Sequence, residues 1–275
     1  MRVGDAVDVA ELISISRRVR AHILRMSAVA KAPHVGSALS CADILVALYF
    51  HAARVAPEKP DDPERDIVIL SKGHGSAALY SVLAERGYFT LATLDTYCAD
   101  GSVLAEHPSR GCVPGVEVTT GSLGHGLGVG VGMAVAAKLA SSARHVYVVL
   151  SDGECNEGSV WEAAMWAPGR RLANVTAIVD FNKFQATGPS TQITALEPLA
   201  EKWRAFGWDT LEIDGHDYTA LVHALTFARQ ERPRAIVAHT LKGKGVSFME
   251  GNLEWHYRPP SAADLELALE EVARS

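Results

Sequence analysis

Two short apolar runs joined by one helical segment constrain the fold of this chain more than any other feature. His145–Leu150 (HVYVVL) and Asn174–Asp180 (NVTAIVD) are rich in β-branched residues, as is typical of buried strands. Between them, Glu157–Ala167 carries apolar residues at helical spacing, with Asn156 as its expected N-cap. A strand, a helix and a strand form a βαβ unit, whose two strands lie parallel through a right-handed crossover. This segment therefore predicts an α/β fold built on a parallel sheet.

The remaining segments extend the same pattern. We expect one α/β domain over residues 1–275, with helices on both faces of a mostly parallel, twisted sheet. No repeat, low-complexity tract or shift in composition marks a domain boundary. Further strands are predicted at Ile67–Leu70, Thr210–Asp214 and Arg234–His239, and further helices at Val9–Ser27, Cys41–His51, Ser76–Glu85 and Tyr218–Glu231.

Polar side chains follow the two strands of the βαβ unit. Asp152 comes just past the first strand and Asn182 just past the second, so both emerge at the carboxyl edge of the sheet, where open α/β folds bind ligands. A carboxylate and an amide oxygen, completed by backbone carbonyls and phosphate oxygens, suit Mg²⁺ or Ca²⁺ and not zinc. Alternatively, both fragments are only turns, because Asp, Gly and Asn are common turn residues. Their matched positions favour a site that holds a diphosphate through a hard divalent cation.

Composition argues against several classes of function. A chain of 275 residues with 48% hydrophobic composition can bury one large core, and with a net charge of −6 and scattered basic residues we expect no nucleic-acid partner. The most apolar segment, Leu123–Ala140, contains five glycines and His125, which makes it too short and too polar to span a membrane. Met1–Arg20 lacks the apolar core of a signal peptide. The four cysteines show no C-x-x-C spacing, so the cytoplasm is the expected compartment.

Four histidines lie where glycine, serine or proline predicts a loop. A lone histidine is more often a surface or core residue than a catalytic one, and most of the other histidines keep that interpretation. Loop positions favour a functional role for these four, because binding residues concentrate on loops held by a rigid scaffold. They are His34 in KAPHVGS, His74 in SKGHGS, His107 in AEHPSRG and His256 in EWHYRPP.

Several of these segments together resemble one enzyme family. Ser151–Ala167 (SDGECNEGSVWEAAMWA) resembles the thiamine-diphosphate motif in its transketolase form, although Ser151 stands where the motif opens with glycine. Thr119–Ala140 resembles the family's glycine-rich T-T-G-P-L-G-Q-G helix, and SKGHGSAALYSVL resembles its S-x-G-H-G-S segment. Pro33 replaces the usual glycine before His34, and the pair Phe181–Asn182 stands where many members of the family have two polar residues. The resemblance runs from about residue 12 to residue 260 and corresponds to the first domain of a transketolase.

This resemblance implies a thiamine diphosphate site that contains Mg²⁺, for which Ca²⁺ or Mn²⁺ can substitute. It implies that Asp152 and Asn182 bind the metal by side chain and Phe184 by its backbone carbonyl. It also implies that the four loop histidines, His34, His74, His107 and His256, act in catalysis by bonding to substrate oxygens and moving protons. The residues implied to contact the cofactor are His74, Gly121, Ser122, Leu123, Asp152, Gly153, Glu154, Asn182, Lys242 and His256.

A full transketolase also has a pyrimidine-binding domain and a C-terminal domain, for which the resemblance finds no counterpart here. The pyrimidine-binding domain supplies a glutamate to the aminopyrimidine ring, and we can assign no carboxylate of this chain to that role. The resemblance thus implies the N-terminal subunit of a split transketolase, paired with a C-terminal subunit as α2β2. Such an enzyme transfers a two-carbon ketol unit from a ketose, as sugar or sugar phosphate, to an aldose. The alternatives are the α subunit of a 2-oxo-acid dehydrogenase or a synthase, and a non-catalytic scaffold that kept the fold.

Overall fold

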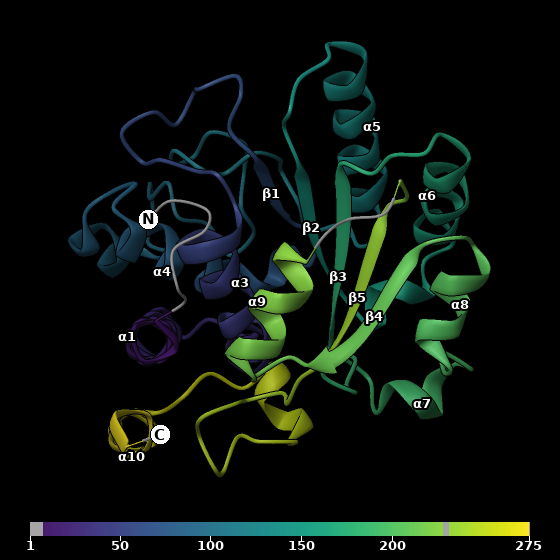
Figure 1. The fold of residues 1–275 in the computed structure, drawn as a ribbon. Coiled ribbons are helices and arrows are strands. Elements are labelled where there is room, and N and C mark those ends of the chain that lie inside the picture. Colours follow the sequence, from purple (N-terminus) through teal and green to yellow (C-terminus); the bar gives the residue numbers. More distant parts are fainter. Residues whose placement is uncertain (1–7, 228–230, 275) are drawn as a thin grey trace.

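The sheet of the molecule is parallel throughout. The structure is a computed structural model that describes residues 8–227 and 231–274 (Figure 1). Within these residues five strands form one sheet in the order β1-β2-β3-β5-β4, and every neighbouring pair is parallel. The predicted α/β class is confirmed. The strands are β1 (Ile67–Leu70), β2 (Val146–Ser151), β3 (Val175–Phe181), β4 (Asp209–Asp214) and β5 (Arg234–His239).

Helices cover both faces of this sheet, as the sequence predicts. Alternate residues of the strands point into two separate cores, so that Val149 packs on one face and Val148 on the other. Figure 1 shows α1, α3, α4 and α9 on one face and α5, α6 and α8 on the other. The helices are α1 (Val9–Ala30), α2 (Val35–Ser40), α3 (Ala42–Ala47), α4 (Ser76–Arg86), α5 (His125–Leu139), α6 (Gly158–Gly169), α7 (Ser190–Ile193), α8 (Leu199–Ala205), α9 (Tyr218–Thr226) and α10 (Ala262–Arg274). No helix in the described ranges combines the length and apolarity that crossing a membrane requires.

The ends of the central strands β2 and β3 determine where the predicted site lies. All residues of β2 and β3 are buried, as expected for parallel strands covered on both faces. Their register pairs Ser151 with Asp180, so the two strands end side by side. The residues that follow them therefore emerge together at the carboxyl edge of the sheet, which is the geometry that the βαβ pattern predicts.

Some helix ends differ from the sequence-based expectation. Helix α6 begins at Gly158 with Glu157 as N-cap, so the prediction of Asn156 as N-cap was wrong. Asn156 lies in a preceding 3-10 turn, where its side-chain oxygen accepts a hydrogen bond from the Thr194 hydroxyl at 2.7 Å, which uses the oxygen that a cap would need. The predicted helix Tyr218–Glu231 ends at Thr226, and residues 228–230 lie outside the described residues.

Two glycines allow the backbone of α5 to pack directly against the sheet. A Cβ atom at Gly126 would lie 2.2 Å from Ser71 Oγ, and one at Gly130 would lie 2.5 Å from Val148 Cγ2. Neither position has room for a side chain, which explains these two glycines. Gly128 and Gly132 point the other way, and a Cβ atom there would meet nothing within 4 Å.

These contacts predict opposite effects of one substitution at two positions of the same helix. Gly126→Ala should lower the free energy of unfolding by about 1–3 kcal/mol, because the new methyl group overlaps Ser71. Gly128→Ala should raise it by about 0.5–1 kcal/mol, because alanine is the better helix former and the site is open. Urea unfolding of the purified chain measures both. Equal effects of the two substitutions would contradict this account of the packing.

Candidate functional site

A cavity of about 420 Å³ opens beyond the carboxyl ends of β1, β2 and β3. Residues from the loops after each of these strands line it, together with the start of α2 and a 3-10 turn at Leu253–His256. This is the edge of an open parallel sheet at which ligands bind. The lining residues are His34, Ser37, His74, His107, Gly121, Leu123, Ser151, Gly153, Asn156, Glu157, Asn182, Phe184, Gln185, Ala186, Thr187, His256 and Tyr257.

Most of the residues proposed from the sequence meet at this cavity. The exceptions are Asp152, Glu154 and Lys242, which are fully buried beside residues that line it, and Ser122, which is exposed. Segments more than 200 residues apart in the chain are thereby brought to one place by the fold. The proposed residues that line the cavity are His34, His74, His107, Gly121, Leu123, Gly153, Asn182, Phe184 and His256.

The four loop histidines form one cluster. The ring centroid of His34 lies 5.3 Å from that of His74, 6.1 Å from that of His107 and 5.0 Å from that of His256. His34 has a left-handed backbone (φ 71°) at the start of α2, and its N–H donates to the carbonyl oxygen of His256 at 2.7 Å. Burial lowers the pKa of His256 to about 3 and also lowers the pKa of His34 and of His74. These three imidazoles are therefore neutral at pH 7, so each can donate through one nitrogen and accept through the other.

The contacts of His256 determine which of its ring nitrogens carries the proton. His34 Nδ1 lies 2.8 Å from a Glu106 carboxylate oxygen but makes no hydrogen bond of normal geometry to it, so only the His256 tautomer is assigned. His256 Nδ1 lies 2.8 Å from Lys242 Nζ, which donates, so His256 carries its proton on Nε2. His256 thus has a free N–H donor at Nε2.

Asp152 and Asn182 are buried and preorganised at the ends of β2 and β3. Asp152 accepts hydrogen bonds from the Gly153 N–H at 2.9 Å and from the Ser190 hydroxyl at 2.6 Å. Burial raises the pKa of its carboxyl to about 6. Asn182 Oδ1 accepts from the Phe184 N–H at 3.0 Å, which sets the direction of the amide. Both side chains are therefore held by neighbours before any ligand binds.

The oxygen donors at this place fit a hard cation that binds together with a phosphorylated ligand. In the part of the chain that the structure describes, no group of three or more His, Cys, Asp or Glu side chains could hold a metal. Asp152 could offer a cation one carboxylate, and Asn182 and the Phe184 carbonyl could offer neutral oxygens. Mg²⁺ is usually bound in this way, through one or two carboxylates and the phosphate oxygens of its ligand. These protein oxygens alone are too few to complete the shell of such a cation, and the oxygens of a bound diphosphate would supply the rest.

A buried ion pair that the sequence reasoning missed supports Asn182. Lys72 Nζ lies 2.5 Å from Asp180 Oδ2, and both side chains are completely buried. The Ser40 hydroxyl donates to the same Asp180 oxygen at 2.6 Å and accepts from Asn182 Nδ2 at 3.1 Å. Lys72 closely follows a fully apolar strand, and a charged residue at such a position is a signal that could have been used.

Two of the residues expected at the cofactor make contacts inside the fold. The Glu154 carboxylate accepts hydrogen bonds from the Gly124 N–H at 2.9 Å and from the Ser71 hydroxyl, so it ties the start of α5 to the end of β1. Lys242 is fully buried with its Nζ against His256. Burial, together with the nearby charge of Lys72, lowers the pKa of Lys242 to about 8. This ammonium group would be stabilised by an anion bound in the cavity.

Comparison with known proteins identifies the class to which this fold and this site belong. Residues 14–272 match the family model described as "Transketolase, thiamine diphosphate binding domain". The chain therefore belongs to this thiamine diphosphate-binding family of transketolases, and the transketolase interpretation is favoured over the alternative of a 2-oxo-acid dehydrogenase or synthase subunit.

Two similar proteins carry the names of transketolase subunits. The chain is 42% identical over 260 residues to a protein of Phocaeicola vulgatus named as one of the subunits of apulose-4-phosphate transketolase, and the match covers 94% of this chain and 92% of that protein. It is 46% identical over 225 residues to the 6-deoxy-6-sulfo-D-fructose transketolase subunit SqwG of a Clostridium species, and this match covers 81% and 82%. The crystal structure of transketolase from Campylobacter jejuni has a TM-score of 0.91 at 30% identity, over 97% of this chain but only 43% of that one.

The buried ammonium group of Lys242 predicts a change in stability with a defined pH dependence. Because its pKa is about 8 in the folded chain and 10.5 in the reference state, its charge destabilises the fold below pH 8. Lys242→Met should therefore raise the free energy of unfolding of the cofactor-free chain at pH 7 by about 1–3 kcal/mol. The gain should shrink as the pH rises from 8 toward 10.5.

Urea unfolding at pH 7 and at pH 9.5 measures this effect. Lys244→Met is the matched control, because the Lys244 side chain is 38% exposed and should change stability little at either pH. A Lys242→Met chain that is less stable than the parent at pH 7 would contradict the proposed electrostatic cost.

Proposed function

We propose that this chain is the diphosphate-anchoring subunit of a transketolase that transfers a two-carbon ketol unit from a ketose to an aldose acceptor. One arrangement supports this function above others. Four histidines surround a cavity beside which Asp152 and Asn182, the proposed metal ligands, are held in place by hydrogen bonds. A scaffold without catalytic function would have no reason to retain buried polar groups that bind nothing, since each is costly unless it is paired.

The residues present fit thiamine diphosphate with Mg²⁺, or with Ca²⁺ or Mn²⁺ in its place. Asp152, Asn182 and the Phe184 carbonyl would hold the metal, and the buried charge of Lys242 would attract the diphosphate. When bound, thiamine diphosphate would supply the nucleophilic carbon that is needed to cleave the carbon–carbon bond next to the ketose carbonyl. The remaining residues proposed to contact it are His74, Gly121, Ser122, Leu123, Gly153, Glu154 and His256.

The histidines would orient the sugar and move its protons. Neutral His34 would take the proton of a substrate hydroxyl, while Glu106, whose carboxylate lies 2.8 Å from His34 Nδ1, would stabilise the imidazolium that forms. His256 Nε2 carries a proton and would donate to an oxygen that gains negative charge. His74 and His107 would hydrogen-bond to other oxygens of the sugar or sugar phosphate. The cluster thus offers an acid and a base within one site, with ring centroids 5.0 Å apart.

We further propose that residues 1–275 form a single domain and that a complementary C-terminal subunit completes the enzyme as α2β2 in the cytoplasm. Two relatives that this chain covers almost completely are named as subunits of their transketolases. Exposed apolar side chains on α5 and α6 support a protein partner, because Leu139 is 82% exposed and Met165 is 63% exposed. Trp166 and Val129, on the same two helices, are also exposed. The complementary subunit would bring the pyrimidine-binding domain and its glutamate.

The metal site is tested by removing one charge without changing size. Asp152→Asn should weaken Mg²⁺-dependent binding of thiamine diphosphate by about tenfold or more, because the site's only proposed carboxylate ligand is lost. The fold should persist, since an amide fills the same buried space. Calorimetric titration of the assembled enzyme with and without Mg²⁺ measures the effect. Glu212→Gln, which alters an exposed carboxylate on β4, is the control, and unchanged affinity in Asp152→Asn would refute the site.

The need for a second subunit is tested by assaying the chain alone. A thiamine enzyme requires a carboxylate against the aminopyrimidine ring and a wall that excludes water, and an anchoring domain offers neither. The purified chain should form no product from ketose donors and aldehyde acceptors, and activity should appear when the complementary subunit is added. Adding the same subunit to the Asp152→Asn chain should produce no activity. Robust ketol transfer by the isolated chain would overturn the split-enzyme proposal.

A further inference from the structure

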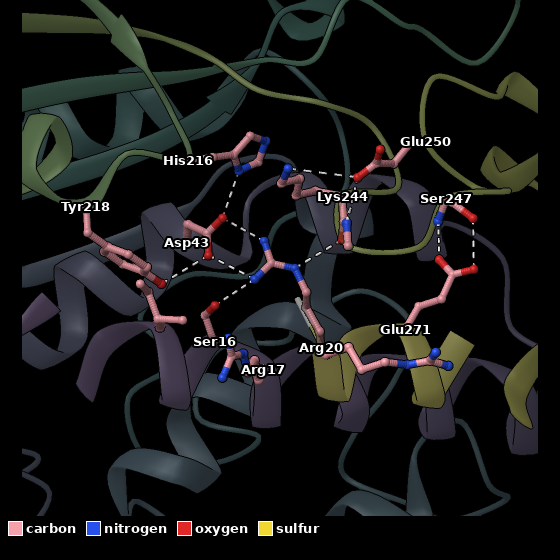
Figure 2. Close-up of a pocket in the computed structure, with 13 residues that line it drawn as sticks. Ser16, Arg17, Arg20, Asp43, His216, Tyr218, Lys244, Ser247, Glu250 and Glu271 are labelled. Atoms are coloured by element: carbon pink, nitrogen blue, oxygen red, sulfur yellow. Dashed lines mark hydrogen bonds and ion pairs between the residues drawn. The ribbon is translucent and has the colours of Figure 1, made fainter. Parts of the chain in front are cut away.

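A second buried polar cluster lies in the wall of a different cavity, of about 660 Å³, bordered by α1, α10 and residues 244–250 (Figure 2). Its centre is Asp43 on α3. One Asp43 oxygen accepts from Arg20 Nη1 at 2.9 Å and from the Tyr218 hydroxyl at 3.0 Å. The other accepts from Arg20 Nη2 at 2.6 Å and lies 2.7 Å from His216 Nδ1. Figure 2 shows these side chains, from α1, α3, α9 and the loop after β4, converging on one carboxylate.

His216 connects this cluster to the loop after β5. The backbone N–H of Leu241 donates to His216 Nε2 at 2.9 Å, so that nitrogen carries no proton. The proton of the neutral ring is therefore on Nδ1, where it is donated to Asp43. The carboxylate thus selects the tautomer of His216 that can accept from Leu241, and both ring nitrogens are engaged.

Arg20 reaches the same loop three residues further along. Its Nε donates to the Lys244 carbonyl at 3.0 Å, while its two terminal nitrogens bind Asp43. The two contacts fall on either side of Lys242, the residue whose Nζ meets His256. Between them, the Gly243 N–H donates to the Gly36 carbonyl at 3.0 Å, which joins the loop to α2. Side chains and backbone therefore hold the loop on both sides of Lys242.

The cluster is costly to bury, which points to a role beyond stability. The side chains of Arg20 and Asp43 are only 6% and 5% exposed. Burial by itself would raise the pKa of the Asp43 carboxyl, but the charge of Arg20 and the hydrogen bonds from His216 and Arg20 hold it well below its usual value. A buried ion pair is often no more stabilising than apolar residues of similar volume. The ion pair has a geometric effect here, because the charged carboxylate of Asp43 orients both Arg20 and His216.

We propose that Asp43, Arg20 and His216 are positioning residues for the cofactor site: they hold the backbone at Leu241 and Lys244 so that Lys242 meets His256 at the cavity. This inference rests on the proposed function, because it is through Lys242 and His256 that the loop would contact the cofactor. No residue of the cluster lines the cavity that holds the histidines. Any effect of the cluster on cofactor binding is therefore indirect.

The first test compares two partners of Asp43, only one of which contacts the loop. His216→Phe keeps a ring but removes the acceptor of the Leu241 N–H, whereas Tyr218→Phe removes one hydrogen bond to Asp43 and leaves the loop contacts intact. Hydrogen exchange of the full chain should become faster across residues 240–246 in His216→Phe, by about tenfold at Leu241. Tyr218→Phe should leave that segment unchanged. Equal protection of the segment in His216→Phe and the parent would overturn the inference.

The second test measures the consequence at the cofactor site. In the assembled enzyme, the Kd of thiamine diphosphate with Mg²⁺ should rise by about tenfold in His216→Phe and stay within about twofold in Tyr218→Phe. His216→Gln, whose amide oxygen can accept from Leu241, should recover part of the loss. If His216→Phe binds like the parent while Asp152→Asn loses Mg²⁺-dependent binding, the positioning role is wrong and the proposed function stands. If Asp152→Asn also binds like the parent, the proposed function itself fails.

A variant that fails to fold would not leave the question open. If His216→Phe aggregates, Arg20→Lys provides a second test. The lysine keeps a positive charge beside Asp43, but its side chain is shorter and lacks the Nε that donates to the Lys244 carbonyl. This variant should show the same faster exchange near Lys244 and the same weaker cofactor binding. Normal exchange and normal affinity in Arg20→Lys would count against the proposed role.

Discussion

The buried ion pair of Lys72 and Asp180 is the interaction on which the geometry of the site depends. It joins the end of β1 to the end of β3 across β2, and the Ser40 and Thr240 hydroxyls bind the same aspartate from α2 and from the end of β5. Four segments of the chain thus meet at one carboxylate. Breaking such a pair from one side leaves an uncompensated buried charge, at a cost of about 3–5 kcal/mol. Asn182, two residues further along, is held by the same Ser40 hydroxyl.

The electrostatics of the site anticipate an anionic ligand. Lys72 is neutralised by Asp180, but the hydrogen bond of the equally buried Lys242 is to a neutral imidazole and not to a carboxylate. Burial lowers the pKa of His34, His74 and His256 and so keeps these three rings neutral at pH 7. Burial and the charge of Lys72 therefore leave the Lys242 ammonium group at a cost that a bound anion would reduce. Arg20 and His216, both bonded to Asp43, contact the loop on either side of Lys242 and so help to hold its backbone in place.

Two departures from the family pattern acquire a structural explanation. Ser151, where the motif has glycine, has room for its side chain, and its hydroxyl accepts from the Glu154 N–H at 3.1 Å. The substitution therefore adds a hydrogen bond within the motif without removing a metal donor. Phe181 is buried at the end of β3, where the ammonium group of Lys183 lies 3.0 Å from its ring centroid. Both changes leave Asp152 and Asn182 in place.

The sequence by itself determined the strands, the βαβ unit and the meeting of Asp152 with Asn182, because these follow from local periodicity and from the parallel crossover. It also identified the four histidines, through loop chemistry and family resemblance. Only the tertiary structure decided which charges pair, since Lys72 and Asp180 are 108 positions apart and His216 and Asp43 are 173 apart. It also decided that Glu154 holds α5, and that Asn156 bonds to Thr194 and does not cap α6. The physical reason is the same in each case: a hydrogen bond or ion pair between distant segments depends on the path of the chain, which no local pattern records.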